Sequence, residues 1–240
     1  MKNSINGINC LIQNKNTSEK LLIRYLVFLT FLIVIILFPE MISAHPIHDL
    51  NSLSAIDTGW IYLQLGFTHI IPYGADHILF VLGLFLLSPK IKPLLVQISV
   101  FTIAHSITLS LAVFNVISIP EIFIEPVIAL SIVFIAVENI YSRKLNSFRV
   151  IVIFIFGLIH GLGFAGVLKE LGLPKDQFVN ALISFNVGVE FGQISVVLIA
   201  FISVGIWFRA KSWYRNRILI PGSVVIALIA CYWAAERLIH

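Results

Sequence analysis

The sequence predicts an all-α fold, a polytopic bundle of transmembrane helices. Of the 240 residues, 59% are hydrophobic and only 12% are charged, and the mean hydropathy is +0.99, so the chain cannot cover itself with a water-facing surface. Several separate apolar runs also reach the roughly 20 residues that a helix needs to cross a hydrocarbon core about 30 Å thick. Most of the surface should therefore face lipid.

The first 44 residues have the pattern of a signal segment. A basic region precedes an apolar run over 21–38, and the small residue Ala44 follows. This order is typical of a cleaved signal peptide, with an uncleaved signal anchor as the alternative because the apolar run is long. We expect residues 1–44 to direct the chain to the inner (cytoplasmic) membrane. Residues 45–58 are polar and lack periodicity, so we expect an extracytoplasmic arm there.

Six hydrophobic segments follow and should form the transmembrane domain, residues 59–240. They lie at roughly 60–88, 94–116, 126–141, 150–168, 178–208 and 218–236. The first is too long for one straight span and contains Pro72 and Gly74, which interrupt or bend a helix. We therefore expect a short entry helix from Trp60 to Ile71 and then a spanning helix from Tyr73.

The basic residues predict the orientation of the bundle and argue against nucleic-acid binding. The net charge is +4, but the lysines and arginines sit in short loops between hydrophobic runs, which is a pattern of membrane topology. With the mature N-terminus outside, nine of them fall on the inside and three on the outside, in the sense of the positive-inside rule. We expect the loops that hold Lys90, Arg143 and Arg215 to be cytoplasmic.

Ionisable side chains lie at bilayer depth in four of the segments. Asp76 and His77 are near the middle of the first predicted span, His105 is in the second, His160 in the fourth and Glu190 in the fifth. Each costs at least about 2.5 kcal/mol on insertion scales, so each needs a partner, a cavity or a function. Their similar depth predicts one polar site near the middle of the membrane.

The residue types in this set predict a transition-metal site. Imidazoles with one or two carboxylates suit Ni²⁺, Co²⁺, Zn²⁺ or Cu²⁺ better than Mg²⁺ or Ca²⁺. The chain has only two cysteines, in the leader and the last apolar run, so a thiolate site is not supported. The predicted ligands are Asp76, His77, His105, His160 and Glu190, with His69, Ser106, Glu138 and Asn186 as further candidates. The alternative role for Ser106 and Asn186 is hydrogen bonding between helices.

At these residues the chain resembles the HupE/UreJ family of bacterial membrane proteins. The resemblance rests on 66–70 with 74–80, on 101–106, on Glu138-Asn139, on 156–161 and on 185–190, and it covers about residues 45–236. Six residues separate His69 from Asp76, one more than in the family's signature, so the chain looks like a divergent branch. The resemblance implies a nickel or cobalt permease, with the metal ion as its substrate.

Two other functions remain open from the residues alone. Three histidines could hold zinc with one coordination position free, which would suit an intramembrane metal-dependent hydrolase or acyl-transfer enzyme. Alternatively, the polar groups could only join helices, in a structural or accessory membrane subunit. A permease needs access to its site from both sides of the membrane, whereas an enzyme needs access from one.

Overall fold

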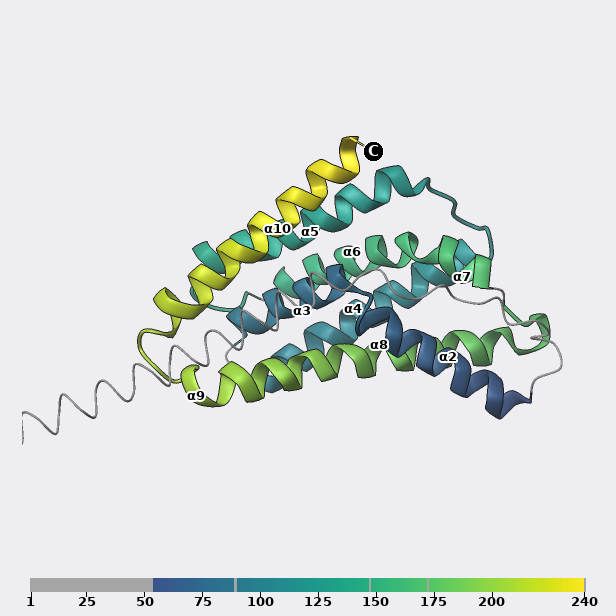
Figure 1. The fold of residues 1–240 in the computed structure, drawn as a ribbon, viewed down its shortest axis with the longest axis horizontal. Helices are drawn as coiled ribbons and strands as arrows, with labels where there is room; N and C mark the ends of the chain where they lie inside the picture. The colour runs from purple at the N-terminus through teal and green to yellow at the C-terminus, as the bar shows by residue number, and fades with distance from the viewer. Residues whose placement is uncertain (1–53, 89, 147, 172, 240) are drawn as a thin grey trace, which may run out of the picture.

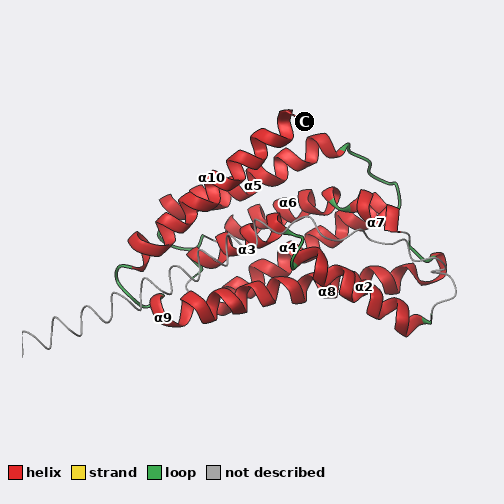
Figure 2. Ribbon diagram, viewed as in Figure 1, coloured by secondary structure: helices red, strands yellow, loops and turns green. Residues whose placement is uncertain are grey.

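The computed structural model describes residues 54–88, 90–146, 148–171 and 173–239 (Figure 1). Throughout these residues the regular secondary structure is helical (Figure 2), which confirms the predicted all-α fold class. The predicted signal segment, residues 1–44, lies outside the described residues, as does most of the predicted arm.

The helices follow the six predicted hydrophobic segments. In chain order they are α2 (Ala55–Ile70), α3 (Ala75–Leu87), α4 (Ile91–Val113), α5 (Glu121–Tyr141), α6 (Phe148–Gly163), α7 (Ala165–Leu171), the 3₁₀ turn η2 (Lys175–Gln177), α8 (Phe178–Ala200), the π-helical turn η3 (Phe201–Gly205), α9 (Ile206–Phe208), the π-helical turn η4 (Arg215–Leu219) and α10 (Ile220–Ile239).

Among the described residues, three helical stretches are long and apolar enough to cross a membrane, namely Ile91–Val113, Phe178–Phe208 and Arg215–Ile239. The pair α2 and α3 makes a fourth if the two bent helices count as one span. At 16 residues, α6 is shorter than a full span. A membrane helix bundle is thus confirmed, while six complete spans remain a prediction.

The first segment is bent, as Pro72 and Gly74 predicted. The axes of α2 and α3 meet at 68°, and the Ile71–Pro72 peptide bond between them is cis. The entry helix starts at Ala55 rather than Trp60. It starts earlier because the side chain of Ser54 accepts a hydrogen bond from the Asp57 amide at 3.2 Å and so caps the first turn.

The bundle is built from three close helix pairs around α3. Figure 1 shows α5 beside α10 and α2 beside α8, with α3, α4 and α6 between them, and the contacts between helices agree. At Gly66 the backbones of α2 and α8 approach so closely that a Cβ atom would collide with the Phe185 carbonyl. Every residue of α3 from His77 to Leu87 is buried, so α3 runs through the interior of the bundle, whereas Pro72 at the bend is exposed.

The loops that carry most of the basic residues lie at one end of the bundle. They are the α3–α4, α5–α6 and α9–η4 connections. A common cavity is lined by Leu86 and Leu87 at the end of α3, by residues of the α5–α6 connection and by residues of the α9–η4 connection. The predicted topology requires the loops at Lys90, Arg143 and Arg215 to lie on the same side of the membrane, and this grouping agrees with that. Their cytoplasmic location remains a prediction.

Candidate metal centre

Three histidines from three helices meet beside the bend. His69 is in the last turn of α2, His77 is in the first turn of α3, and His105 is in the middle of α4. One ligand atom from each lies within 4.8 Å of the other two. The ring centroids are 4.8 Å apart for His69 and His77, and 5.6 Å apart for His77 and His105. We call these three residues the histidine cluster.

Four of the six ring nitrogens in this cluster are buried without hydrogen-bond partners among the described residues. His69 Nε2, His77 Nε2 and both ring nitrogens of His105 have none among the described residues, and His105 is 0% exposed. A buried polar atom left unpaired costs roughly 1–3 kcal/mol, so native proteins rarely keep several together without a reason. Neutral imidazole nitrogen is also the ligand that Ni²⁺, Co²⁺ and Zn²⁺ accept, so these residues fit a metal ion.

A fourth histidine, His160 of α6, borders the cluster and is held by a serine. Its ring centroid is 5.1 Å from that of His77, and its Nε2 lies 2.9 Å from Ser131 Oγ. Ser131 donates its own hydrogen to the Ile128 carbonyl at 2.6 Å. We therefore assign the hydrogen of His160 to Nε2, which donates to Ser131. The buried Nδ1, which has no partner among the described residues, then carries a free lone pair.

Close packing of α4 against α6 brings His105 and His160 into the same region. At Gly161 a Cβ atom would collide with the His105 carbonyl, so only glycine permits this approach. Aromatic rings cover the histidines. The Phe101 ring centroid is 4.9 Å from that of His160, and Phe164 is 3.8 Å from His69. The histidine nitrogens therefore lie in a largely apolar surrounding.

Asp76 is not part of the histidine cluster, although it precedes His77. Both of its carboxylate oxygens bond to Arg237 of α10, with Oδ2 2.9 Å from Nη2 and Oδ1 3.2 Å from Nη1. Arg237 Nε also lies 3.7 Å from Glu125 Oε2. This ion pair ties the start of α3 to α5 and α10, just after the bend and next to the histidines.

Glu190 faces α4 at a different point, and so does Asn186. Ser99 donates to Glu190 Oε1 at 2.7 Å, and Ser106 donates to Asn186 Oδ1. A third contact, from Thr102 to Gln193 Oε1 at 3.0 Å, lies between them. These contacts form a polar ladder between α4 and α8, which matches the interhelical bonding considered for Ser106 and Asn186.

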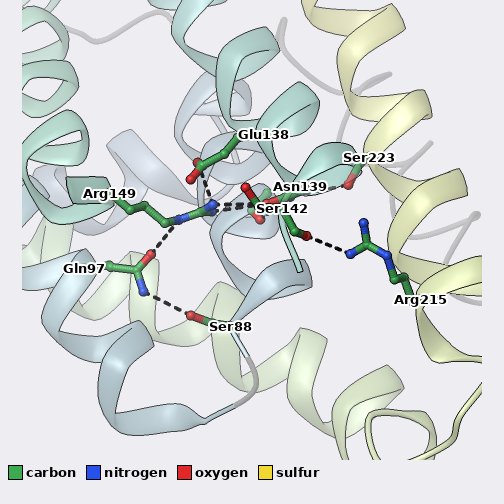
Figure 3. Close-up of polar contacts among 9 residues, drawn as sticks. Ser88, Gln97, Glu138, Asn139, Ser142, Arg149, Arg215 and Ser223 are labelled. Carbon is green, nitrogen blue, oxygen red and sulfur yellow. Dashed lines mark hydrogen bonds and ion pairs between the residues drawn. The ribbon is translucent and has the colours of Figure 1, made fainter. Parts of the chain in front are cut away.

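Glu138 belongs to a separate buried network around Arg149 (Figure 3). Arg149 Nη1 lies 2.6 Å from Glu138 Oε2, and its Nε donates to Gln97 Oε1 at 3.1 Å. Both Nη atoms also lie 3.3 Å from Asn139 Oδ1. Gln97 in turn donates to Ser88 Oγ at 3.0 Å. We call this group the Arg149 network.

Three residues at these sites were not among the sequence candidates. Arg149 and Arg237 were counted only as loop charges, although Arg149 is 2% exposed, and Ser131 was not considered. A signal existed for Arg149, because it follows the first residue of an apolar helix. Ser131 and Arg237 contact residues on other helices. The sequence around each of them does not indicate which residue it contacts.

The chain was compared with family models, curated proteins and solved structures. The model described as HupE / UreJ protein matches residues 48–237. No curated protein matches the chain, and no solved structure does. The family match spans the helices described above, apart from the last two residues of α10, and it includes the histidine cluster, His160 and the polar partners around them. This chain belongs to the HupE/UreJ family.

Proposed function

We propose that this protein is a membrane permease for a divalent transition-metal ion, nickel or cobalt, which passes through the histidine cluster. The observation that carries the proposal is the meeting of His69, His77 and His105 in the interior, with four of their six ring nitrogens unpartnered among the described residues. Imidazole can replace part of the hydration shell of these ions, whereas Mg²⁺ and Ca²⁺ prefer oxygen. The family match supports the same assignment.

The bent span supports transport over fixed binding. His69 and His77 stand on opposite sides of the bend, so a change in the angle between α2 and α3 would change the distance between two ligands. Broken helices with binding groups at the break are typical of transporters, because the break allows the site to rearrange. Release of an ion would then follow from separating His69 from His77.

We propose different roles for the remaining predicted ligands. His160 joins the cluster through Nδ1, since Ser131 occupies its other nitrogen. Asp76 could bind the metal ion only after its ion pair with Arg237 breaks. We therefore assign it to a second conformation of the site, in which that ion pair is broken. Glu190 would have to leave Ser99 in the same way.

The location and domain limits belong to the same proposal. We place the protein in the bacterial inner membrane as a multi-pass protein. Residues 1–44 would act as the signal segment, 45–58 as the extracytoplasmic arm and 59–240 as the transmembrane domain. The lipid bilayer and the metal ion are its proposed partners.

Uptake by purified protein in liposomes tests the permease function. Wild-type protein should accumulate Ni²⁺ or Co²⁺ inside the vesicles above protein-free liposomes, and His77→Ala and His105→Ala should reduce uptake to that background. Ser110→Ala is the matched control, because Ser110 lies on the same helix as His105 and its hydroxyl bonds to the Ser106 carbonyl. Binding of a metal without any accumulation would contradict the permease and favour the zinc-enzyme alternative.

A further inference from the structure

A second site lies at the end of the bundle where the basic loops meet. It is a cavity of about 290 Å³ between the end of α3, the α5–α6 connection and the segment from Arg209 to Leu219. Its polar lining consists of Arg143, Lys144, Arg209, Tyr214 and Arg215, and leucines line the rest. A water molecule takes about 30 Å³ of liquid, so the cavity admits a group several times larger.

No acidic side chain in the described part of the protein compensates the charge of this cavity. Four of its five polar residues are cationic, and none of its lining residues is acidic. In the described part of the chain, ion pairs form at Arg149 and Arg237 but at none of these four side chains. Like charges in one cavity repel each other, so this lining favours an anion.

Two of the guanidinium groups are held in place by neutral partners. Arg215 donates to the Ile140 and Ser142 carbonyls at 2.6 and 2.8 Å, at the end of α5. Arg209 lies over the Phe85 ring, 5.1 Å from its centroid, and its Nε is buried with no hydrogen-bond partner among the described residues. These contacts orient the cations without neutralising them. Both guanidinium groups therefore keep their positive charge at a fixed position beside the cavity.

The cavity lies at the level expected for phospholipid headgroups. Arg209 directly follows the apolar stretch Phe178–Phe208, and Arg215 begins the stretch that ends at Ile239. Trp207, which is 49% exposed, lies just before the connection between them, and Trp213 lies within it. Tryptophan is enriched at the membrane–water interface, and basic pockets between helix ends recognise phosphate headgroups.

We propose that this cavity binds a phosphate-bearing anion, and that its position favours the headgroup of an anionic phospholipid. Arginine presents several N–H donors in a fixed plane that matches phosphate oxygens. Arg209 and Arg215 would hold the phosphate, while the exposed Arg143 and Lys144 would close over it from the rim. The bound lipid would join α3, α5 and α9 at this end of the bundle.

Native mass spectrometry of protein in nanodiscs tests this proposal. The nanodiscs contain phosphatidylcholine with a minor share of phosphatidylglycerol, and a parallel sample in detergent receives inorganic phosphate. Wild-type protein should retain phosphatidylglycerol in excess of its share. Arg209→Gln should lower that retention about tenfold, the typical effect of losing one charge-assisted hydrogen bond.

Lys211→Gln is the matched control, because it removes the same charge from the same loop outside the cavity lining. Lys144→Gln serves as a second cavity variant, since an exposed side chain can be replaced without unfolding the protein. Loss in the cavity variants alone supports the lipid as ligand. Phosphate binding in detergent that depends on Arg209, without lipid enrichment, assigns a soluble phosphate compound instead. Equal losses in Lys211→Gln and Arg209→Gln, or no binding in either arm, would overturn the proposal.

Discussion

The histidine cluster and the Arg149 network are both buried and polar, but they differ in how their polar atoms are satisfied. The donors of Arg149 reach Glu138, Gln97 and Asn139. In the histidine cluster, four ring nitrogens on three residues have no partner among the described residues. A satisfied buried network holds helices together. A set of unpaired imidazole nitrogens, whose lone pairs can coordinate a metal, indicates a binding site.

The largest expected effect is on stability, at the Arg149 network. Arg149→Met should lower the free energy of unfolding by about 3 kcal/mol, because it leaves the Glu138 carboxylate and two amide oxygens without their donor. Denaturation in mixed micelles measures this loss. Replacing Glu138 with leucine in the same protein should recover part of it. A loss below about 0.5 kcal/mol would mean that the network does not hold the bundle together.

Replacing a member of the histidine cluster should affect metal affinity strongly and stability little, the opposite of Arg149→Met. His105→Leu should lower the affinity for Ni²⁺ by more than 100-fold, because it removes a metal ligand. Replacing a residue that only supports a ligand typically costs 10–100-fold. The free energy of unfolding should change by less than about 1 kcal/mol, since an apolar residue of similar size leaves no buried nitrogen unpaired. Equilibrium dialysis and unfolding on the same preparation measure both. A large loss of stability with unchanged affinity would make His105 a packing residue.

Ser131 sharpens the comparison, because it supports a histidine without being a predicted ligand. Ser131→Ala should weaken metal binding about tenfold by releasing His160 from the orientation that its Nε2 bond imposes. Ser110→Ala, which also removes a serine hydroxyl from a membrane helix, should leave affinity unchanged. If His160→Ala has no effect on affinity while Ser131→Ala still does, the orientation argument fails.

The smallest expected effect concerns Asp76 and its arginine. Both side chains are 23% exposed, so Asp76→Asn should cost about 1 kcal/mol of stability or less. If Asp76 acts through its ion pair, Asp76→Asn and Arg237→Gln should reduce nickel uptake equally. If the carboxylate enters the coordination sphere, Asp76→Asn should reduce it much more. Uptake into liposomes, compared between the two variants, decides between these roles.

The fold and part of the site could be predicted because their causes are local. Hydrophobic runs set the helices, and Pro72 and Gly74 set the bend between α2 and α3. The cost of burying an imidazole in a membrane identifies His77 and His105 as candidates from their place in apolar segments alone. Neither inference needs knowledge of which helices are neighbours.

The pairing of charged groups could not be predicted, because it depends on distant segments. Asp76 and Arg237 are 161 positions apart and meet only because α10 packs beside α5 and close to α3. His69 was a secondary candidate, since its place beside His77 depends on the angle of the bend. Sequence therefore indicated which residues were costly to bury, and the packing of helices determined which of them meet.

X-ray absorption spectroscopy of the nickel-loaded protein tests the central claim most directly, because it counts the imidazoles bound to the metal. We predict at least three imidazoles in wild-type protein and one fewer in His69→Ala, because His69, His77 and His105 form the cluster. The count should not change in Ser110→Ala. Nickel bound by oxygen ligands without imidazole, or a count that is the same in His69→Ala as in the wild type, would contradict the account.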